Sequence, residues 1–285
     1  MSRSQRATYF YRAMTAADVR AAHALSVQLK WPHRLEDWAM LQRVAHGFVV
    51  EDQGRLIGTA FTCPQGDYAT IGLVIVDGDY QGQGIGRKLM ELAIEACGSR
   101  TPILNATLAG APLYASQGFV DFGHIQQHQG QALPPTPEPL AAGEQCRSLS
   151  VADHAALIRL ANAGSGLDRK AILDDLFEVV EQAVGIEREG RLCAFALLRP
   201  FGRGRCIGPV VAQNPGQARH LIAVLLAEVP DAFVRIDIPS DCGLAPWLEE
   251  AGLKPVDTVA QMARGTPPQA GAAVQQFALV TQAIG

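Results

Sequence analysis

The chain has 285 residues, of which 48% are hydrophobic and 18% charged, and its formal net charge is -4. This composition is typical of a globular protein and excludes a disordered chain. The small negative charge, without long basic runs, argues against nucleic acid or an anionic membrane as a partner.

The length predicts two domains, because it exceeds that of one ordinary compact domain and is short for three. The six cysteines form no CxxC pair, and the first fourteen residues contain no apolar stretch like that of a signal peptide. No window approaches the roughly 18 apolar residues of a membrane span. We therefore expect a reduced, cytoplasmic protein without a membrane partner.

The first elements with a clear pattern are strands. Two apolar runs, residues 48–50 and 56–61, flank the turn-forming residues 52–54, and this arrangement predicts a β-hairpin. Residues 71–76 form a continuous run rich in β-branched side chains, which indicates a strand in the centre of a sheet.

A glycine-rich turn joins this central strand to a helix. The helix is indicated by apolar residues at helical spacing, Leu89, Leu92, Ala93 and Ala96. Glycines allow positive φ and a close approach of the backbone to an oxyanion, and the helix N-terminus adds partial positive charge. We therefore expect a diphosphate site at the turn, with a turn that serves packing alone as the alternative. The turn consists of Gln81, Gly82, Gln83, Gly84, Ile85, Gly86 and Arg87.

The spacing within the turn excludes two common phosphate-binding motifs. A P-loop needs Ser or Thr after its lysine, but Lys88 is followed by Leu89. A dinucleotide fingerprint needs G-x-G-x-x-G, but Arg87 stands where the third glycine belongs.

The two halves of the chain repeat one another at a nearly constant offset. Gly54-Arg55-Leu56 recurs 136 residues later as Gly190-Arg191-Leu192, and Ile71-Gly72 recurs at the same offset as Ile207-Gly208. Arg12 and Asp18 recur as Arg147 and Asp153 at an offset of 135, and Ala111-Pro112 recurs as Ala245-Pro246 at 134. Residues 133–143 contain four prolines and indicate a semi-rigid linker. We expect domains at 1–132 and 144–285.

The turn closely resembles the [QR]-x-x-G-x-[GA] signature of the GNAT superfamily of N-acetyltransferases, filled here by Gln81, Gly84 and Gly86. The resemblance implies an α/β fold with a mixed sheet, in two tandem GNAT-like domains. It also implies acetyl-CoA as co-substrate, with its pyrophosphate on the amides of residues 81–87. The pantetheine would lie along Val74, Ile75 and Val76. The family usually has proline where Gly78 stands.

A second resemblance lies about thirty residues downstream. Residues 104–107, which include Asn105 and Thr107, are similar to the family's fifth strand, and we expect both residues at the cofactor. Residues 111–119 contain its Leu-Tyr-x-x-x-Gly-Phe element. The resemblance implies that Tyr114 lies near the sulfur of coenzyme A and protonates the departing thiolate. A phenol with a pKa near 10 is protonated at neutral pH and suits this role. A tyrosine that only packs in the core is the alternative.

The second half retains the pattern of the fold without its chemistry. Its turn, residues 213–217, keeps one glycine, and Pro215 lacks the N–H that a phosphate cradle needs. Leu248 stands where the first half has Tyr114 and cannot transfer a proton. We therefore expect a degenerate second domain that builds or closes the acceptor site, as in tandem members of the family.

The residues that contact the acceptor are predicted less directly. Trp31 and His33 lie where the family places a helix-loop-helix over the acceptor, and His33 is a candidate base. Asp67, Asp168 and Arg169 are further candidates, although Asp168 is also placed to cap the next helix. Core packing is the alternative for Trp31, and a solvated side chain is the alternative for His33.

The function predicted from the sequence is direct acyl transfer, most simply of acetyl, from CoA to a small primary amine. Cys63 and Cys97 have no histidine partner in a nucleophile motif, so no covalent enzyme intermediate is expected. The seven histidines show no ligand spacing, so no metal is expected. Two alternatives remain, a non-catalytic acyl-CoA-binding or regulatory module and a protein N-acetyltransferase. The sequence does not indicate the oligomeric state.

Overall fold

The protein is described by a computed structural model that covers residues 9–31 and 33–285. The first half contains a set of strands and helices that begins at Phe10. Its strands are β1 (Phe10–Ala13), β2 (His46–Asp52), β3 (Arg55–Gln65), β4 (Tyr68–Val76), β5 (Thr101–Ala106) and β6 (Val120–Gln131). Its helices are α1 (Val19–Gln28), α2 (Leu35–Val44), α3 (Ile85–Cys97) and α4 (Ala111–Ala115), with 3₁₀ turns at Ala16–Asp18 and Gly78–Tyr80.

The second half repeats this order and adds one strand at its end. Its strands are β7 (Glu144–Ser148), β8 (Gln182–Arg188), β9 (Arg191–Phe201), β10 (Gly204–Ala212), β11 (Phe233–Pro239), β12 (Lys254–Ala263) and β13 (Gln275–Ala278). Its helices are α5 (His154–Ser165), α6 (Lys170–Leu176), α7 (Pro215–Ala227) and α8 (Ala245–Glu250), with a 3₁₀ turn at Val151–Asp153. None of the helices in the described ranges is both long and apolar enough to cross a membrane.

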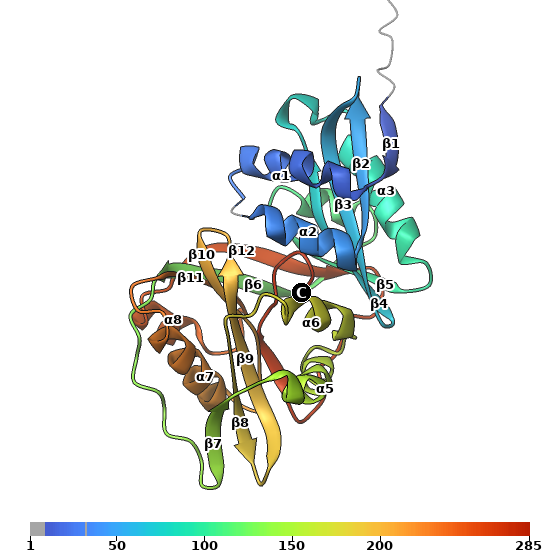
Figure 1. The fold of residues 1–285 in the computed structure, drawn as a ribbon. Coiled ribbons are helices and arrows are strands. Elements are labelled where there is room, and N and C mark those ends of the chain that lie inside the picture. The colour runs from blue at the N-terminus through green and yellow to red at the C-terminus, as the bar shows by residue number, and fades with distance from the viewer. Residues whose placement is uncertain (1–8, 32) are drawn as a thin grey trace, which may run out of the picture.

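The sheet is mixed, as the resemblance implied, but one sheet contains the strands of both halves. Over the described residues its order is β1-β2-β3-β4-β5-β12-β6-β11-β10-β9-β8-β7, and β13 pairs with β10. β12 thus lies between β5 and β6 of the first half, while β6 lies between β12 and β11 of the second half. Figure 1 shows these two strands running between the two lobes.

The exchange of β6 and β12 follows the internal repeat. Ile125 in β6 pairs with Val259 in β12, and the two residues are 134 positions apart. The same offset relates Ala111-Pro112 to Ala245-Pro246. A local two-fold axis therefore passes through this pair. The segment between Gln131 and Glu144 contains neither helix nor strand, and the boundary placed there stays a prediction. The sheet does not follow that boundary, because each half completes the other.

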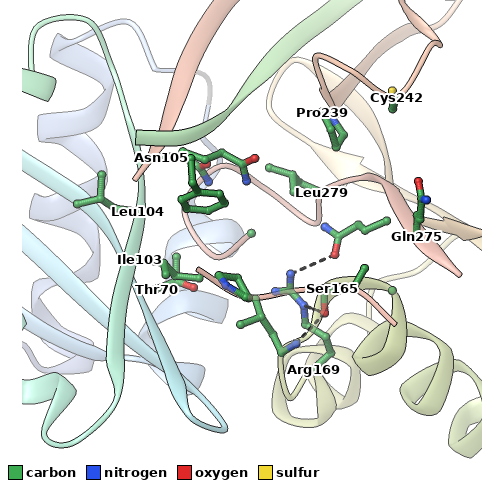
Figure 2. A pocket seen from close by; sticks show the side chains of 18 of the residues that line it. Thr70, Ile103, Leu104, Asn105, Ser165, Arg169, Pro239, Cys242, Gln275 and Leu279 are labelled. Carbon is green, nitrogen blue, oxygen red and sulfur yellow. Dashed lines mark hydrogen bonds between the residues drawn. The ribbon is translucent and has the colours of Figure 1, made fainter. Parts of the chain in front are cut away.

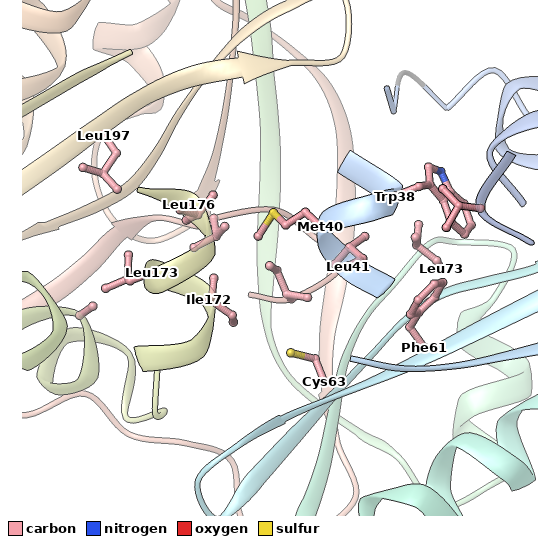
Figure 3. Packing of buried hydrophobic residues seen from close by; sticks show 14 of the residues in the cluster. Trp38, Met40, Leu41, Phe61, Cys63, Leu73, Ile172, Leu173, Leu176 and Leu197 are labelled. Atoms are coloured by element: carbon pink, nitrogen blue, oxygen red, sulfur yellow. The ribbon is translucent and has the colours of Figure 1, made fainter. Parts of the chain in front are cut away.

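The two halves also share a hydrophobic core. Trp38 and Leu41 of α2 belong to the same buried cluster as Leu173 and Leu176 of α6 (Figure 3). At its edge, the Arg43 guanidinium donates two hydrogen bonds to the Asp175 carboxylate, at 2.6 and 2.8 Å. Burial of large apolar side chains from both halves makes a rigid arrangement the expected state.

Both halves contain the same hairpin turn and the same ion pair. Gln53 and Gly54 have positive φ between β2 and β3, which confirms the predicted hairpin, and Glu189 and Gly190 repeat it. Arg12 binds Asp18 through two hydrogen bonds of 2.7 Å, and Arg147 binds Asp153 at 2.7 and 3.0 Å. The repeated residues therefore fix the entry to the first helix of each half.

The Asp153 carboxylate makes the free energy of unfolding depend on pH in the acidic range. Its hydrogen bonds with Arg147, and then with the Ser150 amide, lower the pKa of Asp153 to about 2. The stabilisation is present above the unfolded value near pH 3.8 and is lost as pH falls toward 2. We expect Asp153→Asn to lower the free energy of unfolding, measured with urea, more at pH 7 than at pH 3. Asp67→Asn in an exposed turn is the control, and an Asp153→Asn deficit of equal size at both pH values would contradict this account.

The central strand β4 carries a bulge that separates it from β5. Its pairing with β3 shifts register between Thr59 and Phe61, and Leu73 opposite has φ 48°. Parallel pairing of β4 with β5 runs from Tyr68–Thr101 to Ile71–Leu104 and stops there. Beyond Ile71 the two strands diverge and leave a groove toward the glycine turn.

In the second half, the chain itself fills the equivalent groove. The pairing of β10 with β11 covers only Arg205 and Cys206. Beyond it, β13 pairs antiparallel with β10, opposite Val210 and Ala212. The residues that follow β13, here called the C-terminal tail (residues 279–285), continue from this strand toward the first half.

Candidate functional site

The glycine turn has the backbone that its sequence predicted. Gly82 has φ 76°, and Gly84, the N-cap of α3, has φ 83°. Residues other than glycine rarely adopt these backbone angles. A Cβ added at either position would meet no atom within 4 Å, so backbone conformation is what favours glycine here. The unpaired amides of the first turn of α3 are therefore free to bind an anion.

A cavity of about 680 Å³ extends from this turn along the groove between β4 and β5 to Tyr114. Every predicted cofactor residue except Gln83 lines it, and the Gln83 side chain instead accepts a hydrogen bond from the Tyr9 hydroxyl. The predicted residues on its wall are Val74, Ile75, Val76, Gln81, Gly82, Gly84, Ile85, Gly86, Arg87, Asn105 and Thr107.

Sequence reasoning missed part of this wall. Leu29 and Tyr80 contribute to it, and so do Gly110 and Leu113 beside Tyr114. Both were within reach of the pattern, because Leu113 is the leucine of the recognised Leu-Tyr element and Gly110 lies three residues before it. Leu29 follows α1, a helix distant in sequence, and carries no local signal.

Tyr114 lies in α4, and the Phe119 amide donates a hydrogen bond to its carbonyl at 3.2 Å. Its ring packs edge-on against the Phe119 ring, with centroids 6.3 Å apart. Burial raises the pKa of Tyr114 to about 12, so the phenol is protonated at neutral pH. The side chain lines the cofactor cavity and can donate a hydrogen bond there.

A smaller cavity of about 120 Å³ adjoins the inner end of the cofactor cavity. The two cavities share five lining residues: Trp31, Gly72, Leu73, Asn105 and Thr107. The remaining wall of the smaller cavity comes from both halves and the C-terminal tail: His33, Gln127, Phe201, Arg235, Asp257, Thr281, Gln282 and Ala283. The Gln282 carbonyl accepts a hydrogen bond of 2.8 Å from Asn105 Nδ2, which fixes the tail against β5.

Charged groups of opposite sign face this smaller cavity. Arg235 is buried and donates hydrogen bonds of 2.8 to 3.1 Å to Asp237, and its guanidinium lies 5.4 Å from the Phe201 ring centroid. Asp257, from β12, is exposed and supplies a carboxylate. The lining of the cavity therefore combines charged and aromatic side chains, which suits a small polar molecule.

His33, a predicted acceptor residue, lies in the wall of this smaller cavity. Its ring packs edge-on against Trp31, Trp38 and Phe201, and its Nδ1 is buried without a hydrogen-bond partner among the described residues. Burial, and then the charge of Arg235, lower the pKa of His33 to about 4. The imidazole is therefore neutral at pH 7 and can accept a hydrogen bond.

The other predicted acceptor residues do not meet there. Asp67 is exposed in the turn between β3 and β4 and lines neither cavity. Asp168 accepts a hydrogen bond of 3.0 Å from the Lys170 amide, which is the capping role considered as its alternative. Arg169 is buried and lines a different cavity between the two halves, shown in Figure 2.

The second half has no equivalent cradle. Its helix α7 begins at Pro215, and the N-cap Asn214 side chain accepts a hydrogen bond from the Gln217 amide at 3.0 Å. The Asn214 side chain therefore binds a first-turn amide of α7, whereas no N-cap side chain binds the first-turn amides of α3. Together with β13 in the groove, this arrangement explains why the second half is degenerate.

Comparisons with known proteins agree with this geometry. The profile of an acetyltransferase (GNAT) domain matches residues 43–121, and that of a second acetyltransferase (GNAT) domain matches residues 157–278. The chain is 30% identical over 225 residues to the uncharacterized N-acetyltransferase YitH of Bacillus subtilis (strain 168), which covers 77% of this chain and 78% of the relative.

Solved structures show the same fold over nearly the whole chain. A putative acetyltransferase from Pyrococcus horikoshii superimposes with a TM-score of 0.79 at 18% identity, covering 100% of this chain and 98% of that one. A tandem GNAT protein from the clavulanic acid biosynthesis pathway gives 0.64 at 15% identity, covering 91% and 99%. With two domain matches in series and this relative, the chain belongs to the GNAT acetyltransferases, as a tandem two-domain member.

Proposed function

We propose that the protein transfers an acetyl group from acetyl-CoA directly to a small primary amine. One observation carries the proposal: the long cavity from the glycine turn to Tyr114 shares five lining residues with the smaller 120 Å³ cavity between the halves. A cofactor-sized cavity that meets a cavity for a small molecule is the arrangement that a two-substrate transfer needs. A protein substrate would need an open channel instead.

The residues of the first half suit coenzyme A. The amides of residues 81–87 would face the diphosphate, and the exposed Arg87 in the first turn of α3 lines the same cavity while its guanidinium donates a hydrogen bond of 3.3 Å to Ser116 Oγ. Val74 and Val76 line the groove where β4 leaves β5, which suits the pantetheine chain. The thioester would then lie between Leu73 and Tyr114.

In the proposed step, the amine nitrogen attacks the thioester carbonyl, a C–N bond forms and the C–S bond breaks. The amine loses one proton and the sulfur gains one. With its pKa near 4, His33 is too weak a base to deprotonate an ammonium group, whose pKa is about 10. We therefore propose that the amine reacts in its neutral form and that His33 accepts a hydrogen bond from it.

Tyr114 is the proposed general acid. A thiol has a reference pKa of about 8.5, so complete proton transfer from a phenol near 12 to the thiolate is uphill by about 3.5 pKa units, or about 5 kcal/mol. The larger contribution is then the hydrogen bond that Tyr114 donates while negative charge grows on sulfur, with the proton following as the amine releases its own.

Replacing Tyr114 tests this role. We expect Tyr114→Phe to lower kcat about 100-fold with little change in the KM for acetyl-CoA, because the ring and its packing remain while the donor is lost. Free thiol release from acetyl-CoA, followed across amines, amino acids and polyamines, measures both constants. Tyr68→Phe, whose hydroxyl reaches the Pro267 carbonyl outside the cofactor cavity, should retain activity.

Two results would lead to other conclusions. Equal rates for native protein and Tyr114→Phe would remove Tyr114 from the mechanism. Binding of coenzyme A without acetylation of any amine in the panel would favour the non-catalytic module, and acetylation of peptides alone would favour a protein N-acetyltransferase.

A further inference from the structure

A cavity separate from the acetyl-transfer centre lies between the two halves and has a volume of about 370 Å³ (Figure 2). Ile103 and Leu104 of β5 form one wall, and Leu167 and Arg169, from the segment between α5 and α6, form another. The rest of the wall includes β13, Leu279 and Gly285, together with polar side chains, among them Thr70, Ser165, Gln261 and the exposed Asp241. Leu104 and Asn105 also line the cofactor cavity, so the two spaces are neighbours.

Arg169 lines this cavity, and Gly285 lies next to its guanidinium. Arg169 is only 3% exposed and takes part in no ion pair within the described chain. Its hydrogen bonds all go to neutral oxygens, at Gln65 and the Ile284 carbonyl (2.7 Å each), Ser165 (3.2 Å) and Gln276 (3.3 Å). Burial lowers the pKa of Arg169 to about 10, so it still carries its charge at pH 7.

A second polar group beside Arg169 also lacks a partner. The Gln276 Oε1 atom accepts the hydrogen bond from Arg169, and this contact fixes the orientation of the side-chain amide. Its Nε2 is then buried with no acceptor among the described residues. A buried donor without an acceptor is unfavourable, and a buried cation without a neighbouring anion is more unfavourable still.

The remaining lining limits what the ligand can be. Ile103, Leu167 and Leu279 are buried and apolar, and they offer a surface for an apolar body rather than for a highly charged one. One guanidinium and one amide N–H match the two oxygens of a single carboxylate. We propose that this cavity binds a small organic carboxylate, whose oxygens face Arg169 and Gln276 Nε2 and whose apolar part packs against these side chains.

Matched pairs of probes test the site without any assay of acetyl transfer. Benzoate, phenylacetate and hexanoate are titrated calorimetrically into the full chain, each beside its uncharged carboxamide. We expect at least one carboxylate to bind at least tenfold more tightly than its amide, because only the carboxylate compensates the guanidinium.

Gln276→Glu is the variant of choice, since Arg169→Gln removes a residue that joins four segments and risks unfolding the protein. The new carboxylate keeps the contact with Arg169 and neutralises it, so we expect carboxylate binding to fall at least tenfold while the unfolding temperature is maintained. Gln182→Glu, at an exposed end of β8, adds the same charge elsewhere and should bind as the native protein does. If every probe binds no better than its amide, or if Gln276→Glu binds as tightly as the native chain, the site is not an anion site.

Discussion

Replacing Gly84 with proline is expected to weaken the binding of coenzyme A at least about 100-fold. Gly84 has φ 83°, whereas the ring of proline holds φ near -65°, so the turn must change its course. The N–H of residue 84 is lost as well. One hydrogen bond to a charged oxygen contributes about 1.5–3 kcal/mol, and the displacement of neighbouring amides adds to this loss.

Gly216→Pro in the second half is the matched control. Gly216 lies in the first turn of α7, where backbone amides need no helical partner, and the groove beside it is filled by β13. We expect some loss of stability at α7 but an unchanged Kd for coenzyme A by calorimetry. Equal losses of affinity in the two variants would overturn the assignment of the cofactor to the first half. Circular dichroism establishes that both variants are folded.

The repeat and the glycine turn were the most informative features of the sequence. The glycine turn is local, because its two glycines of positive φ lie among consecutive residues, and the same is true of the hairpin turns at Gln53 and Glu189. The repeated Arg12–Asp18 and Arg147–Asp153 pairs are short-range as well. Such features are predictable because the residues that interact are neighbours along the chain.

The exchange of β6 and β12 was not predictable from the same reasoning. Antiparallel pairing of Ile125 with Val259 joins residues 134 positions apart. Alternating apolar and polar residues predict a strand but do not identify the strand with which it pairs. The smaller cavity was hidden for the same reason, because His33, Arg235 and Gln282 meet only after the halves interlock. Asp67 and Asp168 were plausible by type, but the turn and the helix cap that hold them lie away from that cavity.

The fate of the second groove also depended on distant residues. Pro215 and Leu248 correctly predicted a degenerate half, but only the structure shows that β13 occupies the gap beside β10. The C-terminal tail then reaches the first half, where the Gln282 carbonyl accepts a hydrogen bond from Asn105 Nδ2 and the Ile284 carbonyl accepts one from Gln65 Nε2. The tail that follows the groove-filling strand thereby forms part of the wall of the smaller cavity, the proposed acceptor site.

The contact between Gly72 and the C-terminal tail leads to the second large effect. A Cβ on Gly72 would lie 2.4 Å from the Ala283 carbonyl oxygen, and one on Gly208 would lie 2.0 Å from that of Leu279. The Ile-Gly pair that recurs in both halves therefore stands where the backbone of the tail crosses each bulged strand. Because the neighbouring atom is backbone, Gly72→Ala must displace the tail, at a cost of about 1–3 kcal/mol for an overpacked contact.

We expect Gly72→Ala to raise the KM for the amine at least about tenfold, because Thr281, Gln282 and Ala283 form part of the cavity that the amine enters. The Kd for acetyl-CoA should change much less, since the glycine turn and the amides of α3 remain in place. Gly78→Ala is the control, as a Cβ there meets no atom within 4 Å and its φ is not positive. Steady-state kinetics with both substrates varied separates the two effects. A Gly72→Ala protein with unchanged amine KM would place the acceptor elsewhere than in the cavity between the halves.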